Sequence, residues 1–297
     1  MVDRRPRLRI GAHVRVADGY DAAVAYALEV GCECIQVFGK SPRMWAGPPI
    51  DPGAAERFSA SLAEAAITPL FTHAAYLINL GSTDEAMWHR SVLALADEIA
   101  RASVLHADGV VVHMGTAPDG PQAAASRVAD GAVLAWNAAT AALGLPAPPV
   151  LLENAAGAGR SFGRDVAQIA ATIEAVRSQG VDAVGVCFDT CHAFAAGIDL
   201  RGHDEWSEFV DDLDHRIGLN RLQVIHANDC SGGLGERRDR HAWIGDGGIR
   251  ESGFAAMFAE PRLGHVAAIL EMPGQMPLKD SENVARLRRL RDAASAP

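Results

Sequence analysis

Eight short runs of aliphatic and aromatic residues are spread along the chain, and longer stretches with helical spacing lie between them. In 21–30, 85–102 and 165–176, apolar residues recur three and four positions apart, which is typical of amphipathic helices. The short runs, rich in β-branched and aliphatic residues, are typical of strands. The predicted strands are 8–13, 34–38, 69–73, 109–113, 150–153, 185–189, 222–226 and 267–271.

Eight strand–helix units in 297 residues predict an α/β protein with a single (β/α)₈ TIM barrel over about residues 8–293, whose last helix is 279–293. The alternative is an open, doubly wound sheet, which usually has fewer strands and often carries a G-x-G-x-x-G loop in its first turn. The first turn here, 12–21, has no such loop. No linker rich in proline, glycine or serine divides the chain, so we expect residues 1–297 to form one domain.

Composition narrows the class of protein. With 49% hydrophobic and 22% charged residues, the chain can bury a sizeable core, which excludes a disordered protein. It has no apolar run long enough for a transmembrane helix, and its basic start, 1–9, leads into no apolar segment of a signal peptide. Five cysteines are too few, and oddly numbered, for a disulfide scaffold. We therefore expect a cytoplasmic protein without a membrane partner.

Polar residues gather where the predicted strands end. All eight carboxyl ends of a (β/α)₈ barrel meet at one mouth, so these side chains should face one another there. One such histidine alone is more often structural, but unpaired charges packed this densely are costly, and cations are the natural compensation. Imidazole and carboxylate ligands suit zinc, manganese or iron. Seven of the eight runs end in this way, at His13, His73, His113, Glu153, Asp189, His226 and Glu271.

Two further segments extend this cluster. Asp189 opens a D-T-C-H sequence that places His192 just beyond its strand. The D-R-H sequence places Asp239 and His241 two residues apart, which in an extended segment puts both on one side. The cysteines form no C-x-x-C pair and no serine has a G-x-S-x-G setting, so we expect neither a cysteine ligand nor a serine nucleophile.

These motifs together resemble the endonuclease IV family of apurinic/apyrimidinic endonucleases (deoxyribonuclease IV), and the resemblance runs from about residue 10 to residue 271. The most specific stretches are GVCFDTCHAFAAGIDLR (185–201) and RRDRHAWIGDGGI (237–249). The other matching stretches are IGAHV (10–14), KSPRMW (40–45), HAAYLINLGS (73–82), VVHMG (111–115), LLENAAGAG (151–159), HANDC (226–230) and ILEMPG (269–274).

The resemblance implies three divalent metal ions, typically Zn²⁺ with Mn²⁺ as a second choice. It implies that Glu153 bridges two of them, and we expect Glu153, Asp189 and Glu271 to be the catalytic residues. The implied ligands are His73, His113 and Glu153 for one ion, Glu153, Asp189, His226 and Glu271 for a second, and His192, Asp239 and His241 for the third. Three such ions outweigh the four carboxylates, which leaves the positive charge that a phosphodiester needs.

The resemblance implies hydrolysis of the phosphodiester 5′ to an abasic site in duplex DNA, leaving a 3′-hydroxyl and a 5′-deoxyribose phosphate, as part of base excision repair. No protein nucleophile is evident, which fits water activated by a metal ion. A net charge of −10 argues against DNA binding through a broad basic surface, but not against binding through metal ions. The expected partner is therefore duplex DNA with an abasic site, bound by a monomer.

The resemblance also implies DNA contacts from the loops after the second and third strands. Arg43, Tyr76 and Leu77 would fill the gap left by an extruded nucleotide. The alternative is that Tyr76 and Leu77 are core residues. We also expect Lys40 among the DNA contacts, although it and four arginines could be either phosphate contacts or ordinary surface charges; the arginines are Arg160, Arg237, Arg238 and Arg240.

Two other functions compete with this interpretation. A xylose-isomerase-like sugar isomerase or epimerase shares the barrel and the strand-end ligands, but it usually needs only one or two ions. The additional ligands of D-T-C-H and D-R-H argue for a third ion and hence against it. A non-catalytic metal-binding or DNA-binding protein is the other alternative, and the complete ligand set argues against it.

Overall fold

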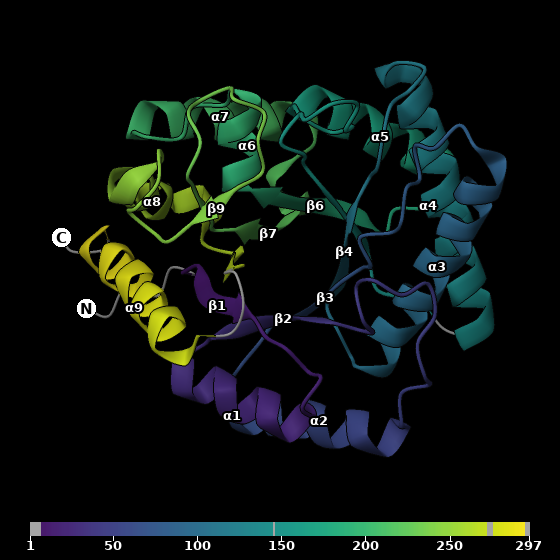
Figure 1. Ribbon diagram of the computed structural model, residues 1–297, viewed down its shortest axis with the longest axis horizontal. Helices are drawn as coiled ribbons and strands as arrows, with labels where there is room; N and C mark the ends of the chain where they lie inside the picture. Colours follow the sequence, from purple (N-terminus) through teal and green to yellow (C-terminus); the bar gives the residue numbers. More distant parts are fainter. Residues whose placement is uncertain (1–6, 145, 272–275, 295–297) are drawn as a thin grey trace.

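The computed structural model describes residues 7–144, 146–271 and 276–294, and its centre is a closed barrel of parallel strands (Figure 1). The ring runs β1-β10-β7-β6-β5-β4-β3-β2 and closes because β1 pairs with both β2 and β10. The barrel strands are β1 (Arg9–His13), β2 (Cys34–Phe38), β3 (Leu70–His73), β4 (Gly109–His113), β5 (Val150–Glu153), β6 (Val184–Asp189), β7 (Leu222–His226) and β10 (Ala267–Leu270). The predicted TIM barrel is confirmed, with each strand boundary within one residue of its prediction.

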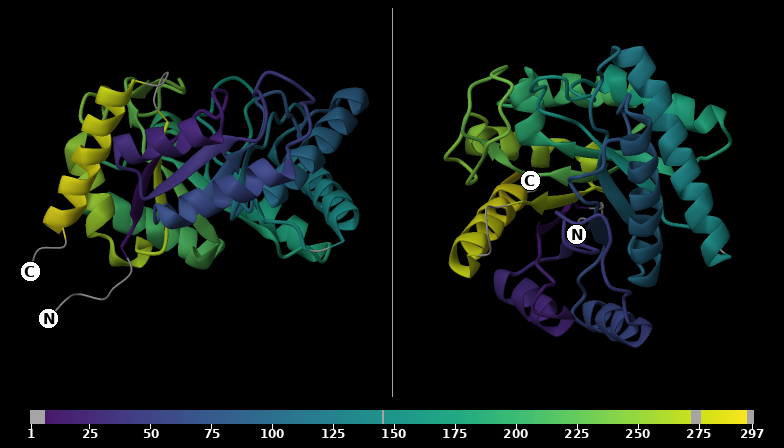
Figure 2. Two further views of the ribbon diagram at one scale, coloured as in Figure 1. Left: turned by 90° about the horizontal axis from the view of Figure 1, so that it is seen from below. Right: turned by 45° about the vertical axis from the view of Figure 1, so that its right-hand side comes forward.

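Helices surround this ring on all sides in the view down the shortest axis, and Figure 2 shows the same enclosure from two further directions. The last helix, α9, packs against α1 and β1 and so completes the outer layer. No helix within the described ranges is long and apolar enough to cross a membrane. The helices are α1 (Tyr20–Val30), α2 (Pro52–Glu64), α3 (Glu85–Val104), α4 (Pro121–Leu143), α5 (Val166–Ser178), α6 (Thr190–Ala196), α7 (His203–Arg216), α8 (Arg250–Ala259) and α9 (Pro277–Ala294), with 3-10 turns η1 (Leu219–Arg221) and η2 (Pro261–Leu263).

Helix boundaries follow from local chemistry. Asp84 caps α3 by accepting a hydrogen bond from the Met87 amide, and Asp165 caps α5 in the same way through the Gln168 amide. The predicted helices 21–30, 85–102, 165–176 and 279–293 are all present, each shifted by only one or two residues at an end. Residues 272–274 of the matching stretch ILEMPG lie outside the described ranges, as do the two ends of the expected domain.

The barrel interior explains why the polar strand ends meet. Side chains two positions apart share one face of a strand, so a residue two positions beyond an interior residue enters the mouth of the barrel. Phe71, Val111 and Leu151 lie in the interior, and two positions later stand His73, His113 and Glu153. The complete interior cluster is Cys34, Phe71, Val111, Leu151, Cys187, Val224, Ala267 and Ile269.

Candidate metal centre

All nine expected ligands lie together at the mouth. Most stand at strand ends, whereas His192 lies on α6, His241 on the short strand β9 (His241–Ala242), and Asp239 in the loop before it. Their ligand atoms form groups in which all lie within 4.8 Å of one another. Three of these groups match the expected sets, namely His73, His113 and Glu153; Glu153, Asp189, His226 and Glu271; and His192, Asp239 and His241. We call them the first, second and third groups.

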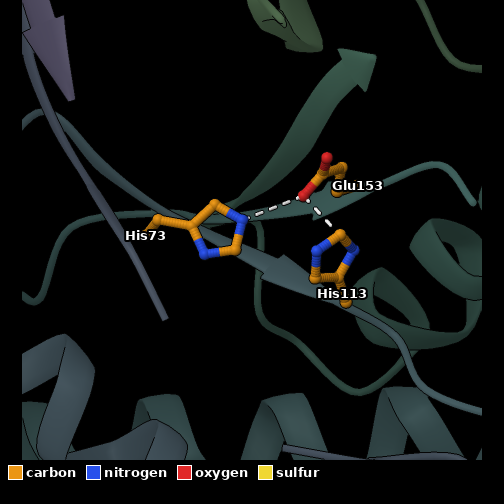
Figure 3. A group of neighbouring side chains, drawn as sticks. All are labelled: His73, His113 and Glu153. Carbon is orange, nitrogen blue, oxygen red and sulfur yellow. Dashed lines mark hydrogen bonds and ion pairs between the residues drawn. The ribbon is translucent and has the colours of Figure 1, made fainter. Parts of the chain in front are cut away.

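Glu153 joins the first and second groups. Its Oε2 lies 3.1 Å from Nε2 of His73 and 3.4 Å from Nδ1 of His113 (Figure 3). Its Oε1 lies 3.1 Å from Nδ1 of His226, in the second group. The Glu153 side chain is fully buried, and its two oxygens face different groups, as a bridging ligand requires.

The second group combines three carboxylates with one imidazole. Nδ1 of His226 lies 3.2 Å from Oε2 of Glu271 and 3.9 Å from Oδ2 of Asp189. His226 and Asp189 are fully buried, and Glu271 is largely covered. This number of buried acidic groups is not balanced by the one histidine, so the second group has the composition of a cation site.

Asp189 ties the second group to the third through helix capping. It ends β6 and is the N-cap of α6, where its Oδ1 accepts a hydrogen bond of 2.7 Å from the His192 amide. Its other oxygen faces His226 and lies 3.6 Å from Nε2 of His241. The D-T-C-H sequence therefore fixes the relative positions of two ligands, Asp189 and His192, through the first turn of α6.

The third group is more open. Oδ2 of Asp239 lies 3.2 Å from Nε2 of His192, and Oδ1 lies 3.3 Å from Nε2 of His241. The Asp239 side chain is 55% exposed. A two-residue antiparallel ribbon of β8 (Asp229–Cys230) and β9 holds this loop, and the amides of Gly235 and Arg237 donate to carbonyls of α6.

Main-chain carbonyls orient three of the five histidines. In each, Nδ1 contacts a carbonyl oxygen and leaves Nε2 to face the carboxylates. Nε2 of His241 is buried and has no hydrogen-bond partner among the described residues, which fits the role of a cation ligand. The contacts are His73 to the Ala74 carbonyl at 2.7 Å, His192 to that of Asn154 at 2.9 Å, and His241 to that of Glu271 at 2.9 Å.

The histidines and carboxylates at the mouth shift one another's pKa values. Burial opposes a proton on His73, but its hydrogen bond to Glu153 raises its pKa to about 9. Burial likewise opposes a proton on His241, yet Asp189 and Asp239 raise its pKa to about 10. Burial disfavours the ionised form of Glu153, but the neighbouring histidines hold the pKa of its carboxyl well below its usual range. Protons on the histidines thus supply positive charge that metal ions can replace.

Three of the four expected DNA-contacting residues lie where a large ligand can reach them. Arg43 is exposed, Leu77 is half-buried, and Tyr76 is 58% exposed, so the alternative that Tyr76 is a core residue is wrong. The Tyr76 ring packs edge-on against His73, and its amide donates to the Pro42 carbonyl at 3.1 Å. A cavity of about 1180 Å³ runs from this loop to the metal centre; its lining includes Arg43, Tyr76, His241 and Glu271.

Lys40 requires a correction. The sequence places it among the residues that contact DNA, but its side chain is only 1% exposed. Its ammonium lies 2.7 Å from Asp97 and 2.8 Å from Glu98, both on α3. Glu98 also accepts a hydrogen bond from the Ala75 amide. A buried ammonium with two carboxylate partners ties together the loops after β2 and β3 and does not face a phosphate.

Sequence reasoning missed the buried amides around the ligands. Asn228 donates to Oδ2 of Asp189 at 2.6 Å and accepts from the Glu271 amide at 2.8 Å. Asn154 donates to the Asp189 carbonyl and accepts from the Asp189 amide. The available signal was position, because each asparagine follows a ligand by one or two residues. Gln36 is the third missed amide, and it interrupts an otherwise apolar run.

Comparisons with known proteins agree on one protein family. The family of xylose isomerase-like TIM barrels matches residues 24–292. A probable endonuclease 4 of Methanoculleus marisnigri is 38% identical over 285 residues, which cover 96% of this chain and 99% of the relative. The crystal structure of endonuclease IV from Thermus thermophilus has a TM-score of 0.83 at 36% identity, and the match covers 96% of this chain and 99% of that one.

Sugar-converting enzymes are more distant. A D-tagatose 3-epimerase-like protein matches 97% of the chain with a TM-score of 0.66, but at only 18% identity. A likeness at that level shows a shared barrel and carries no inference about the reaction.

Proposed function

Because the chain belongs to the endonuclease IV family of xylose isomerase-like TIM barrels, we propose that it is a metal-dependent apurinic/apyrimidinic endonuclease. It hydrolyses the phosphodiester on the 5′ side of an abasic site in duplex DNA and leaves a 3′-hydroxyl and a 5′-deoxyribose phosphate, as one step of base excision repair. The convergence of three ligand groups at one barrel mouth, with Glu153 between two of them, is the observation that carries this proposal.

The ligand chemistry favours Zn²⁺ at three sites, with Mn²⁺ as the second choice. Such ions, when bound, lower the pKa of water toward neutrality and neutralise charge on a phosphate. The chain's own contribution is to fix where this happens. Glu153 holds the first and second groups at one spacing, and Asp189 and Glu271 complete the second group, of which Glu271 also lines the cavity.

The exposed loop residues supply the selectivity for a lesion. An abasic nucleotide has lost its base pairing and stacking, so drawing it out of the helix costs less than extruding an intact nucleotide. Tyr76 stands at the rim with its ring against His73, and Arg43 lines the same cavity. An aromatic ring and a guanidinium can replace the lost stacking, and Leu77 can act as a wedge in the minor groove.

The direct test is cleavage of one labelled duplex that carries a single tetrahydrofuran site. Tetrahydrofuran cannot undergo β-elimination, so any cut must be hydrolytic. We expect one cut on the 5′ side, with a 3′-hydroxyl that a DNA polymerase extends. The same duplex without the lesion should stay intact under identical conditions.

One result would contradict the proposed endonuclease activity. Zn²⁺-loaded protein that leaves the tetrahydrofuran duplex intact, yet epimerises or isomerises a sugar, would favour the sugar-converting alternative. Glu153→Gln protein is the matched control, because it removes the charge of the shared ligand while keeping its shape. Cleavage that persists at full rate in this variant would point to a contaminating nuclease.

A further inference from the structure

We propose that Gln36 is a positioning residue of the second ligand group, where one buried amide sets the ring orientation of His226 and the carboxylate orientation of Glu271. This inference rests on the proposed function, because it concerns how ions are held at that centre. Gln36 is fully buried on β2, two positions beyond the interior residue Cys34. Its side chain therefore enters the mouth on the same face as the ligands.

The contacts of Gln36 use both ends of its amide. Oε1 lies 2.9 Å from Nε2 of His226. Nε2 donates to Oε1 of Glu271 at 2.8 Å and lies 2.9 Å from Nδ1 of His13. A primary amide has two N–H groups and one carbonyl oxygen, so these three contacts use each of its groups once.

The sense of these hydrogen bonds is fixed by the carboxylate. Turning the amide over would place its oxygen against the ionised Glu271 and leave that contact repulsive. The amide oxygen therefore faces His226, so Nε2 of His226 must carry the proton. Nδ1 faces Glu153 and Glu271, so it is the nitrogen that a cation of the second group would take in place of a proton.

His226 differs from three other histidines in this respect. His73, His192 and His241 are oriented by main-chain carbonyls and present Nε2 to the carboxylates. His226 is turned the other way and is oriented by a side chain. A substitution at Gln36 therefore alters the support of a ligand while every ligand remains in place.

His13 completes the network and accounts for its place at a strand end. Its Nδ1 lies 2.9 Å from Nε2 of Gln36 and 3.5 Å from Oε1 of Glu271, and its Nε2 is buried with no hydrogen-bond partner in the described part of the chain. The ring packs against Phe38 with centroids 4.3 Å apart, which holds it in this orientation. Because His13 is in none of the ligand groups, we place it in the support of the second group.

The test is a pair of substitutions at position 36, measured by the metal content of the protein. Gln36→Met keeps the length and apolar stem but removes every hydrogen bond. Gln36→Glu keeps an acceptor for His226 but cannot donate to Glu271. We expect Gln36→Met to bind one Zn²⁺ more weakly by about 10- to 100-fold, the usual cost of losing a ligand's hydrogen-bonding partner. Gln36→Glu should bind it at least as weakly, because it places an oxygen against Glu271.

The measurements are Zn²⁺ retained per chain against a competing chelator and the visible absorption of Co²⁺-loaded protein, which reports coordination geometry. Gln223→Met is the matched control, because Gln223 also lies on a barrel strand, β7, but is half-buried and precedes the ligand His226 by three positions. It should retain Zn²⁺ and the Co²⁺ spectrum of the unaltered protein. If Gln36→Met does not fold, the same comparison with Gln36→Glu decides.

Failure of the Gln36 inference can be distinguished from failure of the proposed metal centre. Unaltered protein that holds three Zn²⁺, together with Gln36→Met protein that holds them equally tightly and with the same Co²⁺ spectrum, overturns the role of Gln36 alone. Unaltered protein that cannot be loaded with more than one Zn²⁺ overturns the metal centre on which the inference rests.

Discussion

The strand-end ligands and the loop ligands are held in different ways. His113 and Glu153 are direct neighbours in the register of β4 and β5, as are Asp189 and His226 in that of β6 and β7. The continuous hydrogen bonding of the barrel therefore fixes the first and second groups. Asp239 lies in a loop and is 55% exposed, and this loop is held by a ribbon of two residue pairs and two main-chain hydrogen bonds to α6.

This difference teaches which part of the centre is set by the fold and which part is added to it. Any barrel with the right residues at its strand ends can form the first two groups, because the barrel alone brings those ends to one mouth. The third group needs the D-T-C-H turn and the D-R-H loop together. We therefore expect the ion of the third group to be the most exchangeable of the three.

The largest effect is expected from Glu153→Gln, which alters the ligand shared by two strand-end groups. Loss of its charge should lower kcat on the tetrahydrofuran duplex by about 10²–10³-fold or more, as for other losses of a central electrostatic element. Circular dichroism should show the barrel intact. Normal activity with normal Zn²⁺ content would mean that the centre of the site is elsewhere.

Asp239→Asn tests the loop side of the comparison. It should lower the affinity for one Zn²⁺ by at least about 10- to 100-fold, while the ions of the strand-end groups stay in place. Equilibrium dialysis against a chelator measures this. Simultaneous loss of all ions would show that the loop and the strand ends form one inseparable unit.

Protons should compete with metal ions at both kinds of site. The pKa of His73 is raised to about 9 and that of His241 to about 10, from an ordinary value of 6.5. Raised values mean that these protons stabilise the metal-free fold fully below about pH 6.5 and that this contribution is lost as the pH rises through about 9 and 10. Zn²⁺ must displace them, so its apparent affinity should rise with pH through this window, by up to about tenfold per pH unit for each proton.

Titration calorimetry in two buffers of different ionisation enthalpy counts the protons released by Zn²⁺. Release of protons at a pH about one unit above neutrality is the expected result, because both histidines still carry theirs there. Zn²⁺ binding that releases none, with an affinity independent of pH, would contradict the assignment of these histidines as ligands.

The smallest effect on DNA binding is expected at Lys40. Lys40→Met should lower the free energy of unfolding by about 3 kcal/mol, because it leaves Glu98 buried without its ammonium partner. The slope of log affinity against log salt should not change. Arg43→Met is the matched control in the same loop, since Arg43 is exposed. A slope reduced by about 0.9 in Lys40→Met would indicate a phosphate contact after all.

The sequence was sufficient for the strands and for the meeting of the strand-end ligands at one mouth because both follow from short-range rules, whereas the division of the ligands into groups came from the family resemblance. A run such as VLLE ends at Glu153, and the period of two then directs Glu153 into the mouth. Lys40 could not be judged in the same way. Its partners Asp97 and Glu98 lie on α3, far along the chain, and only the packing of that helix against the loop reveals its burial.

Gln36 was missed for a related reason. A polar residue inside the apolar run CIQVF carries no motif of its own, and its partners come from three other strand ends distant in sequence. Only closure of the barrel brings these together. The support of a ligand is thus less visible in a sequence than the ligand itself, because it has no fixed residue type or spacing.

The most direct test of the account is a count of Zn²⁺ per chain during slow removal by a chelator. Elemental analysis of reconstituted protein should give three ions per chain. We expect one to leave first, from the third group, and two to persist together at the strand ends. A ceiling of one ion per chain after reconstitution, or loss of all ions in a single step, would contradict a centre in which the barrel holds two sites and a loop adds the third.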